Sequence, residues 1–489
     1  MSTPPELDPD TCYRAFETRD ARFDGRFFVA VRTTRVFCRP VCPARTPKRT
    51  NVEFHGSAAS AFAAGFRPCL RCRPERAPRL AGDSPGAALV ARALAEIDAG
   101  ALDDASLEVL SARIGVTSRH LRRLFESHLG AAPITVAQTR RLMFARQLIE
   151  ETDLPMTRIA FAAGFASVRR FNAAIAQAYH SAPSQLRRHP AVRTSAAGTI
   201  TLRIAAMDRA SLAGLLRFYA ARAFRGIEAV EADRYARTVR IGEGVGWFGV
   251  RRADDMLVLD SALPDAAILP RVVARVRRMF DLASARGAIS AHLVADGGLA
   301  PALAGGAPRV PCAWDAFELA VRAVLGQQVS VAAATTLAGR LVERFGTAVA
   351  SGDERLTRLF PSPAELAAAK LAALTALGIV RARAATIITL AGHVAATPGW
   401  RDNYKGLDPF CADFTALPGI GPWTAQYVAM RGFADPDAFP AGDLGLLRAA
   451  RSLGIAETAR ELERRAERWR PWRAYAAQAL WNHSTRDAA

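Results

Sequence analysis

Four cysteines near the amino end have the spacing of a metal site. Cys38 and Cys42 stand in FCRPVC, Cys69 and Cys72 stand in RPCLRC, and 26 residues separate the two pairs. Two close pairs of thiolates can wrap one tetrahedral zinc ion, and with no histidine in either pair all four ligands would be sulfur. We therefore predict a four-cysteine zinc site, in a domain expected to have little apolar core of its own.

The setting of these cysteines suggests chemistry as well as structure. Zinc with four thiolates has a formal charge of minus two, so each sulfur stays electron-rich and can act as a nucleophile. A purely structural zinc is the alternative, and it is the commoner use of such a site. Basic residues favour contact with an anionic polymer, and they surround the cysteines: Arg32, Arg35, Arg39, Arg45, Lys48, Arg49, Arg67, Arg71 and Arg73.

A second candidate for chemistry lies in LPGIGPWTAQYVAMRGFADPDAFPAGD (417–443). Its turn contains Gly419 and Gly421, whose backbone N–H groups stay uncovered where a helix begins, and such a turn suits a phosphate. Asp443 follows twenty residues after Trp423, as a lone carboxylate between Ala-Gly and an apolar run. The arrangement predicts contact with a phosphate and a functional role for the Asp443 carboxylate.

This pattern resembles the helix-hairpin-helix, Gly-Pro-Asp superfamily of DNA base-excision glycosylases. GQQVS (326–330) and AERWRPWRAYA (466–476) make the chain similar to the AlkA-type 3-methyladenine glycosylases in particular. LPGIG alone is a weak motif, but these features in this order are specific. The resemblance implies that an alkylated base is swung out of the duplex. It also implies that Asp443 stabilises the positive charge that develops on the sugar and orients water.

The resemblance extends to a base pocket and a DNA-binding surface. It implies an aromatic wall of Trp423, Tyr427 and Trp481, which would stack on electron-poor, cationic bases. Phe218 and Arg222 match pocket positions, although Phe218 is equally well explained as a core aromatic. Trp469 and Trp472 are expected in the core. The DNA contacts implied here are Gln327, Gln328, Gly419 and Gly421, with Gln328 at the position of the residue that wedges into the vacated stack.

Departures from related patterns limit the expected chemistry. Glycosylases that also cut the strand have a lysine two residues after the second glycine of the hairpin, where this chain has Trp423, so we expect a monofunctional enzyme. Only Cys411 lies near the carboxyl end, so no iron-sulfur cluster is expected. Pro311-Cys312 is followed by Ala-Trp instead of the His-Arg of the Ada-type O6-methylguanine acceptor. Cys312 is therefore expected to be a buried thiol.

The cysteine region also resembles a known family, through VRTTRVFCRPVCPAR and AAGFRPCLRC. Both are similar to the amino-terminal domain of Ada-type adaptive-response proteins. The resemblance implies that Cys38 irreversibly takes a methyl group from a methyl phosphotriester in DNA, while Cys42, Cys69 and Cys72 complete the zinc site. It places Thr34, Arg45, Arg67 and Arg71 near the DNA.

Residues 106–130 and 156–188 repeat one plan, a helix, a glycine turn and a second helix. Gly115 and Gly164 mark the turns, Thr117 or Ser118 caps one second helix, and Ser167 caps the other. Joined by a helix around 140–150, the two units resemble AraC-type DNA-binding domains. Major-groove contacts are expected from the second helices, although a solvated helix face is the alternative: Arg119, His120, Arg122, Arg169, Arg170 and Asn172.

Between the two halves, residues 198–310 alternate as strand, helix and three strands, followed by a helix. We predict the strands in TITLRIAA, IEAVEADRYARTVRIG with GWFGVRR, and MLVLDS, with IGEGVGW (241–247) as a hairpin turn. The pattern resembles the amino-terminal α+β layer of AlkA-type enzymes. Residues 311–489 show successive helical patterns without a sustained heptad, which favours a compact bundle.

Composition is consistent with DNA binding. The 489 residues have a net charge of +19, carried mostly by arginine, and no acidic residue occurs from Leu154 to Met207. An arginine-rich coding bias is the alternative. No apolar run reaches the roughly 18 residues of a membrane span, and the first residues do not form a signal peptide, so we expect a cytoplasmic, nucleoid-associated bacterial protein.

We predict a multidomain, mainly α protein with four parts. These are a zinc α+β domain (1–80), a double helix-turn-helix domain (81–195) whose helices follow a GDSPG linker (82–86), a TBP-like α+β layer (198–310) and a helix-hairpin-helix glycosylase bundle (311–489). The expected function is alkylation repair coupled to transcriptional activation, with zinc as cofactor. Alkylated and promoter DNA and RNA polymerase are the expected partners. The alternative is a regulator with a structural zinc and a non-catalytic DNA clamp.

Overall fold

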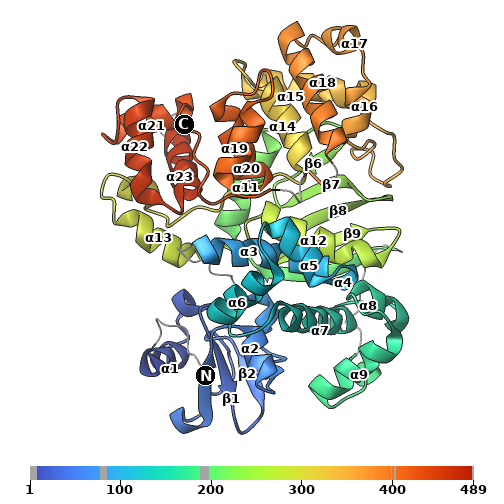
Figure 1. Ribbon diagram of the computed structural model, residues 1–489, viewed down its shortest axis with the longest axis vertical. Helices are drawn as coiled ribbons and strands as arrows, with labels where there is room; N and C mark the ends of the chain where they lie inside the picture. The colour runs from blue at the N-terminus through green and yellow to red at the C-terminus, as the bar shows by residue number, and fades with distance from the viewer. Residues whose placement is uncertain (1–7, 78–84, 188–197, 398, 401–403, 487–489) are drawn as a thin grey trace. The chain divides into compact units, whose positions relative to one another are not determined.

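A computed structural model describes residues 8–77, 85–187, 198–397, 399–400 and 404–486 (Figure 1). Residues 1–7 and residues 82–84 of the predicted linker lie outside this part. The chain divides into two compact units. The amino-terminal unit comprises residues 1–206, 256–277 and 282–285, and the carboxyl-terminal unit comprises residues 207–255, 278–281 and 286–489. The four domain ranges expected from the sequence are a finer division and stay a prediction.

The amino-terminal unit begins with a small α+β domain. Its four strands lie in the order β3-β1-β2-β4, with β2 and β4 parallel and the other pairs antiparallel. Val29 pairs with Cys38, so the sheet fixes the first cysteine. The elements are α1 (Pro9–Glu17), β1 (Phe28–Val31), β2 (Val36–Cys38), β3 (Val52–His55), α2 (Ala58–Ala63) and β4 (Arg67–Pro68).

The expectation of a poor apolar core in this domain was wrong. One cluster of buried side chains includes Phe16, Phe27 and Val29 together with the four predicted zinc ligands. A second cluster, on the other face of the sheet strands, includes Phe28 and Phe37. Alternation along β1 sends neighbouring side chains into different clusters, so this four-residue strand contributes to two cores.

Two helix-turn-helix units follow, as predicted. Gly115 (φ +86°) ends α5, and the Thr117 hydroxyl accepts the backbone N–H of His120 at 3.2 Å to cap α6. Gly164 (φ +87°) ends the turn after α8, and Ser167 caps α9 through the N–H of Arg170. The helices are α3 (Pro85–Asp98), α4 (Ala101–Asp104), α5 (Leu107–Ile114), α6 (Ser118–Leu129), α7 (Pro133–Glu151), α8 (Met156–Ala162), α9 (Val168–Tyr179) and α10 (Pro183–Leu186).

The amino-terminal unit also contains strands β5 (Ile200–Ala206) and β9 (Met256–Ala262), which pair antiparallel. Helix α7 is bonded directly to β5. The Gln147 side chain donates to the backbone carbonyl of Arg203 at 2.9 Å, and the Glu151 carboxylate accepts the backbone N–H of Arg203 at 2.8 Å. Residues 200–206 therefore belong structurally with the helix-turn-helix region.

The carboxyl-terminal unit contains α11 (Arg209–Ala220) and three antiparallel strands, β6 (Glu228–Val230), β7 (Arg234–Ile241) and β8 (Gly244–Ala253). The single strand predicted over IEAVEADRYARTVRIG was wrong. A tight turn, in which the N–H of Glu231 donates to the carbonyl of Arg234, divides it into β6 and β7. The hairpin predicted at 241–247 is confirmed, with Ile241 paired to Gly244.

Helices make up most of the rest of this unit. GQQVS separates two helices, because the chain breaks between α14 and α15 and Gln328 takes φ +55°. The helices are α13 (Arg286–Val294), α14 (Ala316–Leu325), α15 (Val331–Phe345), α16 (Pro363–Ala367), α17 (Leu371–Thr375), α18 (Arg381–Ala396), α19 (Leu407–Thr415), α20 (Pro422–Gly432), α21 (Leu444–Ser452), α22 (Ala459–Ala466) and α23 (Arg473–Arg486).

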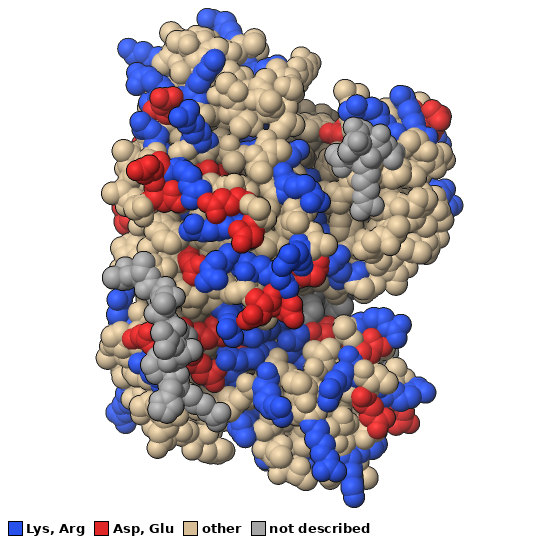
Figure 2. All heavy atoms as spheres, turned by 180° about the vertical axis from the view of Figure 1, so that it is seen from behind, with Lys and Arg blue, Asp and Glu red and all other residues tan. Residues whose placement is uncertain are grey.

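The multidomain, mainly α fold class is confirmed. Among the described helices, none is both long and apolar enough to cross a membrane. Figure 2 shows lysine and arginine side chains spread over one face of the molecule, interspersed with acidic ones.

Candidate functional sites

The four predicted zinc ligands come together. The sulfur atoms of Cys38, Cys42, Cys69 and Cys72 all lie within 4.8 Å of one another, and all four residues are buried. A tetrahedral zinc with bonds of about 2.3 Å requires sulfurs about 3.8 Å apart. The chemistry and spacing of the donors therefore fit one zinc ion.

Backbone donors surround this cluster. The N–H of Arg39 points to Cys72 Sγ at 3.3 Å, and the N–H of Arg71 points to Cys69 Sγ at 3.4 Å. Such N–H groups stabilise negative charge on sulfur. Cys12 lies in the same apolar cluster but outside the ligand set, and burial, aided by Asp8, raises the pKa of its thiol to about 11.

The predicted DNA-binding residues of the amino-terminal unit are mostly exposed. Thr34 lies in the turn between β1 and β2, and Thr34, Arg45 and Arg71 are exposed while Arg67 is half-buried. On α6 and α9 the apolar faces, including Leu121 and Phe171, point inward. The opposite sides carry the predicted groove residues, of which His120 is half-buried and the others are exposed: Arg119, Arg122, Arg169, Arg170 and Asn172.

The predicted hairpin joins α19 to α20. Gly419 has φ +82°, and a Cβ on it would lie 2.0 Å from the Thr386 hydroxyl oxygen, so the turn requires glycine. Gly421 precedes Pro422 at the start of α20, and within the described part of the chain no side chain caps this helix end. Gln327 donates to the Gly419 carbonyl at 3.0 Å, whereas Gln328 is exposed.

Asp443 caps helix α21 and accepts four hydrogen bonds. Its Oδ1 accepts the N–H groups of Gly445 (2.8 Å) and Leu446 (3.0 Å) and the indole N–H of Trp481 (2.9 Å). Its Oδ2 accepts the indole N–H of Trp423 at 3.0 Å. The four donors fix the position of both carboxylate oxygens, so the arrangement suits stabilisation of positive charge.

The aromatic residues expected in the base pocket form one cluster with Asp443. Trp423 and Tyr427 stack with centroids 5.1 Å apart, and Tyr427 meets Trp481 edge-on at 6.4 Å. The Arg222 guanidinium lies 4.1 Å from the centroid of the half-buried Phe218 ring. Arg431 connects the two groups, 4.5 Å from the Phe218 ring and 4.9 Å from that of Trp481.

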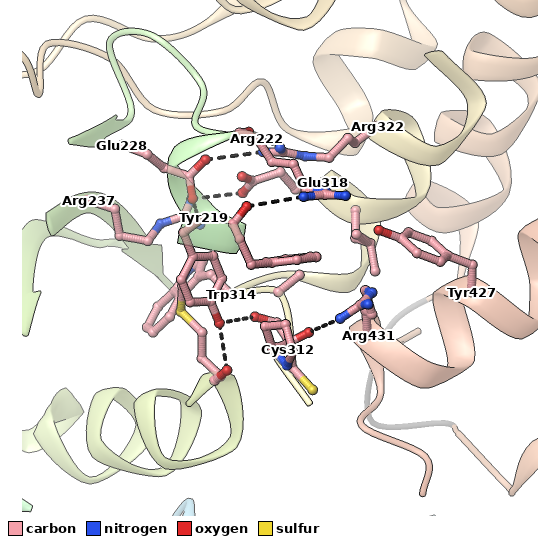
Figure 3. Close-up of a pocket in the computed structure, with 15 residues that line it drawn as sticks. Tyr219, Arg222, Glu228, Arg237, Cys312, Trp314, Glu318, Arg322, Tyr427 and Arg431 are labelled. Carbon is pink, nitrogen blue, oxygen red and sulfur yellow. Dashed lines mark hydrogen bonds and ion pairs between the residues drawn. The ribbon is translucent and has the colours of Figure 1, made fainter. Parts of the chain in front are cut away.

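A cavity of about 40 Å³ lies beside this cluster. Its lining includes Phe218, Arg222, Tyr427 and Arg431. Two buried glutamates and two further arginines also line it (Figure 3): Glu228, Glu318, Arg237 and Arg322. Burial raises the pKa of Glu228, but Arg322 and Arg237 outweigh it and the net shift is downward. By itself this cavity is too small to hold a purine.

Sequence reasoning missed Arg431. The signal was available, because Trp423, Tyr427 and Arg431 follow one another at intervals of four residues on helix α20 and therefore share a face. Other expectations are confirmed. Trp469 and Trp472 are buried in the core. Cys312 is a buried thiol, and burial raises its pKa to about 12.

Comparisons with known proteins cover most of the chain. Residues 11–75 match the metal binding domain of Ada, 110–189 a helix-turn-helix domain, 201–315 the AlkA N-terminal domain, and 321–474 the HhH-GPD superfamily of base excision DNA repair proteins. A probable bifunctional transcriptional activator/DNA repair enzyme AlkA of Mycobacterium tuberculosis is 43% identical over 97% of this chain and 96% of its own length. The chain belongs to this family.

Relatives of each half support the same conclusion. DNA-3-methyladenine glycosylase 2 of Escherichia coli is 35% identical over 55% of this chain and 92% of its own length. The bifunctional transcriptional activator/DNA repair enzyme Ada of Escherichia coli is 36% identical over 31% of this chain and 42% of its own length. The family joins an Ada-type methyl-transfer sensor to an AlkA-type DNA glycosylase, and this chain carries both parts, including the four-cysteine zinc site.

Proposed function

We propose that Cys38 accepts a methyl group from a methyl phosphotriester in DNA. Its sulfur bonds to the methyl carbon as the carbon–oxygen bond breaks, and the electron pair stays on the phosphate oxygen. The neutral triester becomes an anionic diester and Cys38 becomes a thioether, so the transfer is irreversible. Zinc, when bound, keeps the four sulfurs as thiolates, the form that attacks. Thr34, Arg45, Arg67 and Arg71 hold the DNA backbone.

Methylation then serves as the signal for transcription. The cluster changes from minus two to minus one, which weakens its repulsion of phosphate and strengthens DNA binding. Helices α6 and α9 read the promoter through the exposed basic residues named above, and RNA polymerase is the partner that responds. The four domain ranges expected from the sequence assign these tasks to residues 1–80 and 81–195.

Mass spectrometry after incubation with methylated DNA tests the sensor. We expect one added methyl group on the Cys38 peptide. Cys12→Ala is the matched control, because Cys12 is buried in the same cluster without being a ligand, and this variant should accept methyl normally. An unmodified Cys38 peptide in the zinc-loaded wild type would support a purely structural zinc. A promoter reporter should also lose its response in Cys38→Ala.

The carboxyl-terminal unit, we propose, hydrolyses the glycosidic bond of alkylated bases such as 3-methyladenine. The observation that carries this proposal is the carboxylate of Asp443 held among Trp423, Trp481 and Tyr427. The base stacks on these rings and on Phe218, beside Arg222, while Asp443 stabilises positive charge on the sugar. Gln327, Gln328, Gly419 and Gly421 hold the DNA. With Trp423 in place of a lysine, water is the nucleophile and an abasic site is the product.

Release of 3-methyladenine from alkylated DNA tests this activity. Asp443→Asn should reduce it on the order of 100-fold, while asparagine still caps α21. Thr458→Ala removes a different cap, that of α22, and should leave activity unchanged. Equal release by wild type and Asp443→Asn would refute Asp443 as catalyst. Absence of release by the wild type would leave only a DNA clamp.

A further inference from the structure

Arg431 occupies the aromatic cluster that the sequence assigned to the flipped base. It is 3% exposed. Its guanidinium carbon lies 4.5 Å from the ring centroid of Phe218, 4.9 Å from that of Trp481 and 5.4 Å from that of Tyr427. A permanent cation therefore already contacts three of the rings proposed to receive the lesion.

Two hydrogen bonds fix this guanidinium, and one of its three nitrogens has no acceptor among the described residues. Nη1 donates to the Pro311 carbonyl at 2.7 Å, and Nη2 donates to the Gln478 side-chain oxygen at 2.9 Å. The buried Nε has no acceptor among the described residues. Because Arg431 lines the cavity beside Phe218 and Tyr427 (Figure 3), an unsatisfied donor and a positive charge are both available at the base pocket.

The surroundings of Arg431 do not neutralise it. Its two acceptors are uncharged, and among the described residues no carboxylate is a main electrostatic partner of it. Arg222 adds a second guanidinium against the Phe218 ring at 4.1 Å. A cationic base would approach these like charges in a water-poor site, where repulsion is weakly screened.

We propose that Arg431 sets the lesion preference of the glycosylase. Its charge disfavours bases with a formal positive charge, such as 3-methyladenine and 7-methylguanine in DNA, relative to neutral alkylated bases that present a hydrogen-bond acceptor. This inference rests on the proposed base pocket. It departs from the expectation that the aromatic rings alone select cationic lesions, because the rings already contact the guanidinium of Arg431.

Excision rates on duplexes with a single lesion test the proposal. The ratio of 7-methylguanine to 1,N6-ethenoadenine excision should rise about tenfold in Arg431→Met and in Arg431→Gln. Removal of one buried positive charge next to the base can account for a change of this size. Arg431→Lys keeps the charge and should keep the ratio near that of wild type. An unchanged ratio in a folded neutral variant, verified by thermal melting, would overturn the proposal and leave Arg431 a structural residue.

A measurement on the unaltered protein covers the case in which neither neutral variant folds. The N1–H of 7-methylguanine is lost as pH rises through neutrality, which removes the net positive charge of that base. Its excision relative to ethenoadenine should then rise with pH, and a flat ratio would contradict the proposal. Wild type that excises neither lesion would instead refute the proposed glycosylase function itself.

Discussion

At the scale of single residues, Gly445 controls how closely Trp481 approaches Asp443. A Cβ at this position would lie 3.0 Å from Asp443 Oδ1 and 3.3 Å from Trp481 Cδ1. Gly445→Ala should therefore displace the indole or the carboxylate and lower glycosylase activity about tenfold, because small misplacements of catalytic groups are costly. Thermal stability should hold or rise slightly, since alanine favours the helix.

Gly442→Ala supplies the control for this prediction. Gly442 lies three residues away, and a Cβ added to it would have no neighbouring atom of the described residues within 4 Å, so this variant should retain full activity. Equal activities of the two alanine variants would mean that the contact between Trp481 and Asp443 does not matter for excision.

At the scale of elements, helix α7 is held to the zinc domain by a buried arginine. Arg146 is fully buried, donates to the Cys69 carbonyl at 3.2 Å and pairs with Glu75 at 2.6 Å. Arg146→Met leaves Glu75 without this partner. Breaking a buried pair in this way costs about 3–5 kcal/mol, so we expect a clearly lower melting temperature and weaker zinc retention.

An exposed arginine provides the comparison for Arg146. Arg355 pairs with Asp353 and Glu231, but its side chain is about half exposed, and exposed pairs contribute little. Arg355→Met should melt close to wild type. Similar melting temperatures for the two variants would show that the Arg146 contacts do not stabilise the amino-terminal unit.

The sequence predicted the features of the amino-terminal unit that depend on local patterns. Cysteine spacing identified the zinc ligands, and Gly115, Gly164 and Ser167 marked the helix-turn-helix boundaries, because turns and caps are set within a few residues. The positions of Arg146 and Arg431 were not predicted. Their hydrogen-bond acceptors are 71 or more positions away for Arg146 and 47 or more for Arg431. Spacing places Arg431 on the same helix face as Tyr427, but it does not show whether an arginine in a helix meets solvent or a buried acceptor.

At the scale of the whole molecule, strand β5 follows the predicted boundary at residue 195 and belongs to the amino-terminal unit. Strand β5 bonds to helix α7 through Gln147 and Glu151. A fragment of residues 1–197 would lose both bonds and leave the buried Glu151 carboxylate with fewer donors. We expect this fragment to melt at a lower temperature than the same region in the full chain, as followed by calorimetry.

A fragment of residues 1–285 is the appropriate control, because it retains β5 and β9, which pair within the amino-terminal unit. It should recover part of the lost stability if it folds. If the 1–197 fragment melted at the same temperature as the amino-terminal unit of the full chain, β5 would contribute nothing to the thermal stability of that unit.

The bonds from Arg203 to helix α7 also bear on a chain that has been cut. A protease acting between residues 187 and 198 would sever the peptide link, yet the β5 backbone would remain seated against Gln147 and Glu151. The two pieces would then migrate together on a sizing column and separate only in denaturant. In such a nicked protein, the helix-turn-helix region and the glycosylase region would thus stay associated through non-covalent contacts of β5 with α7.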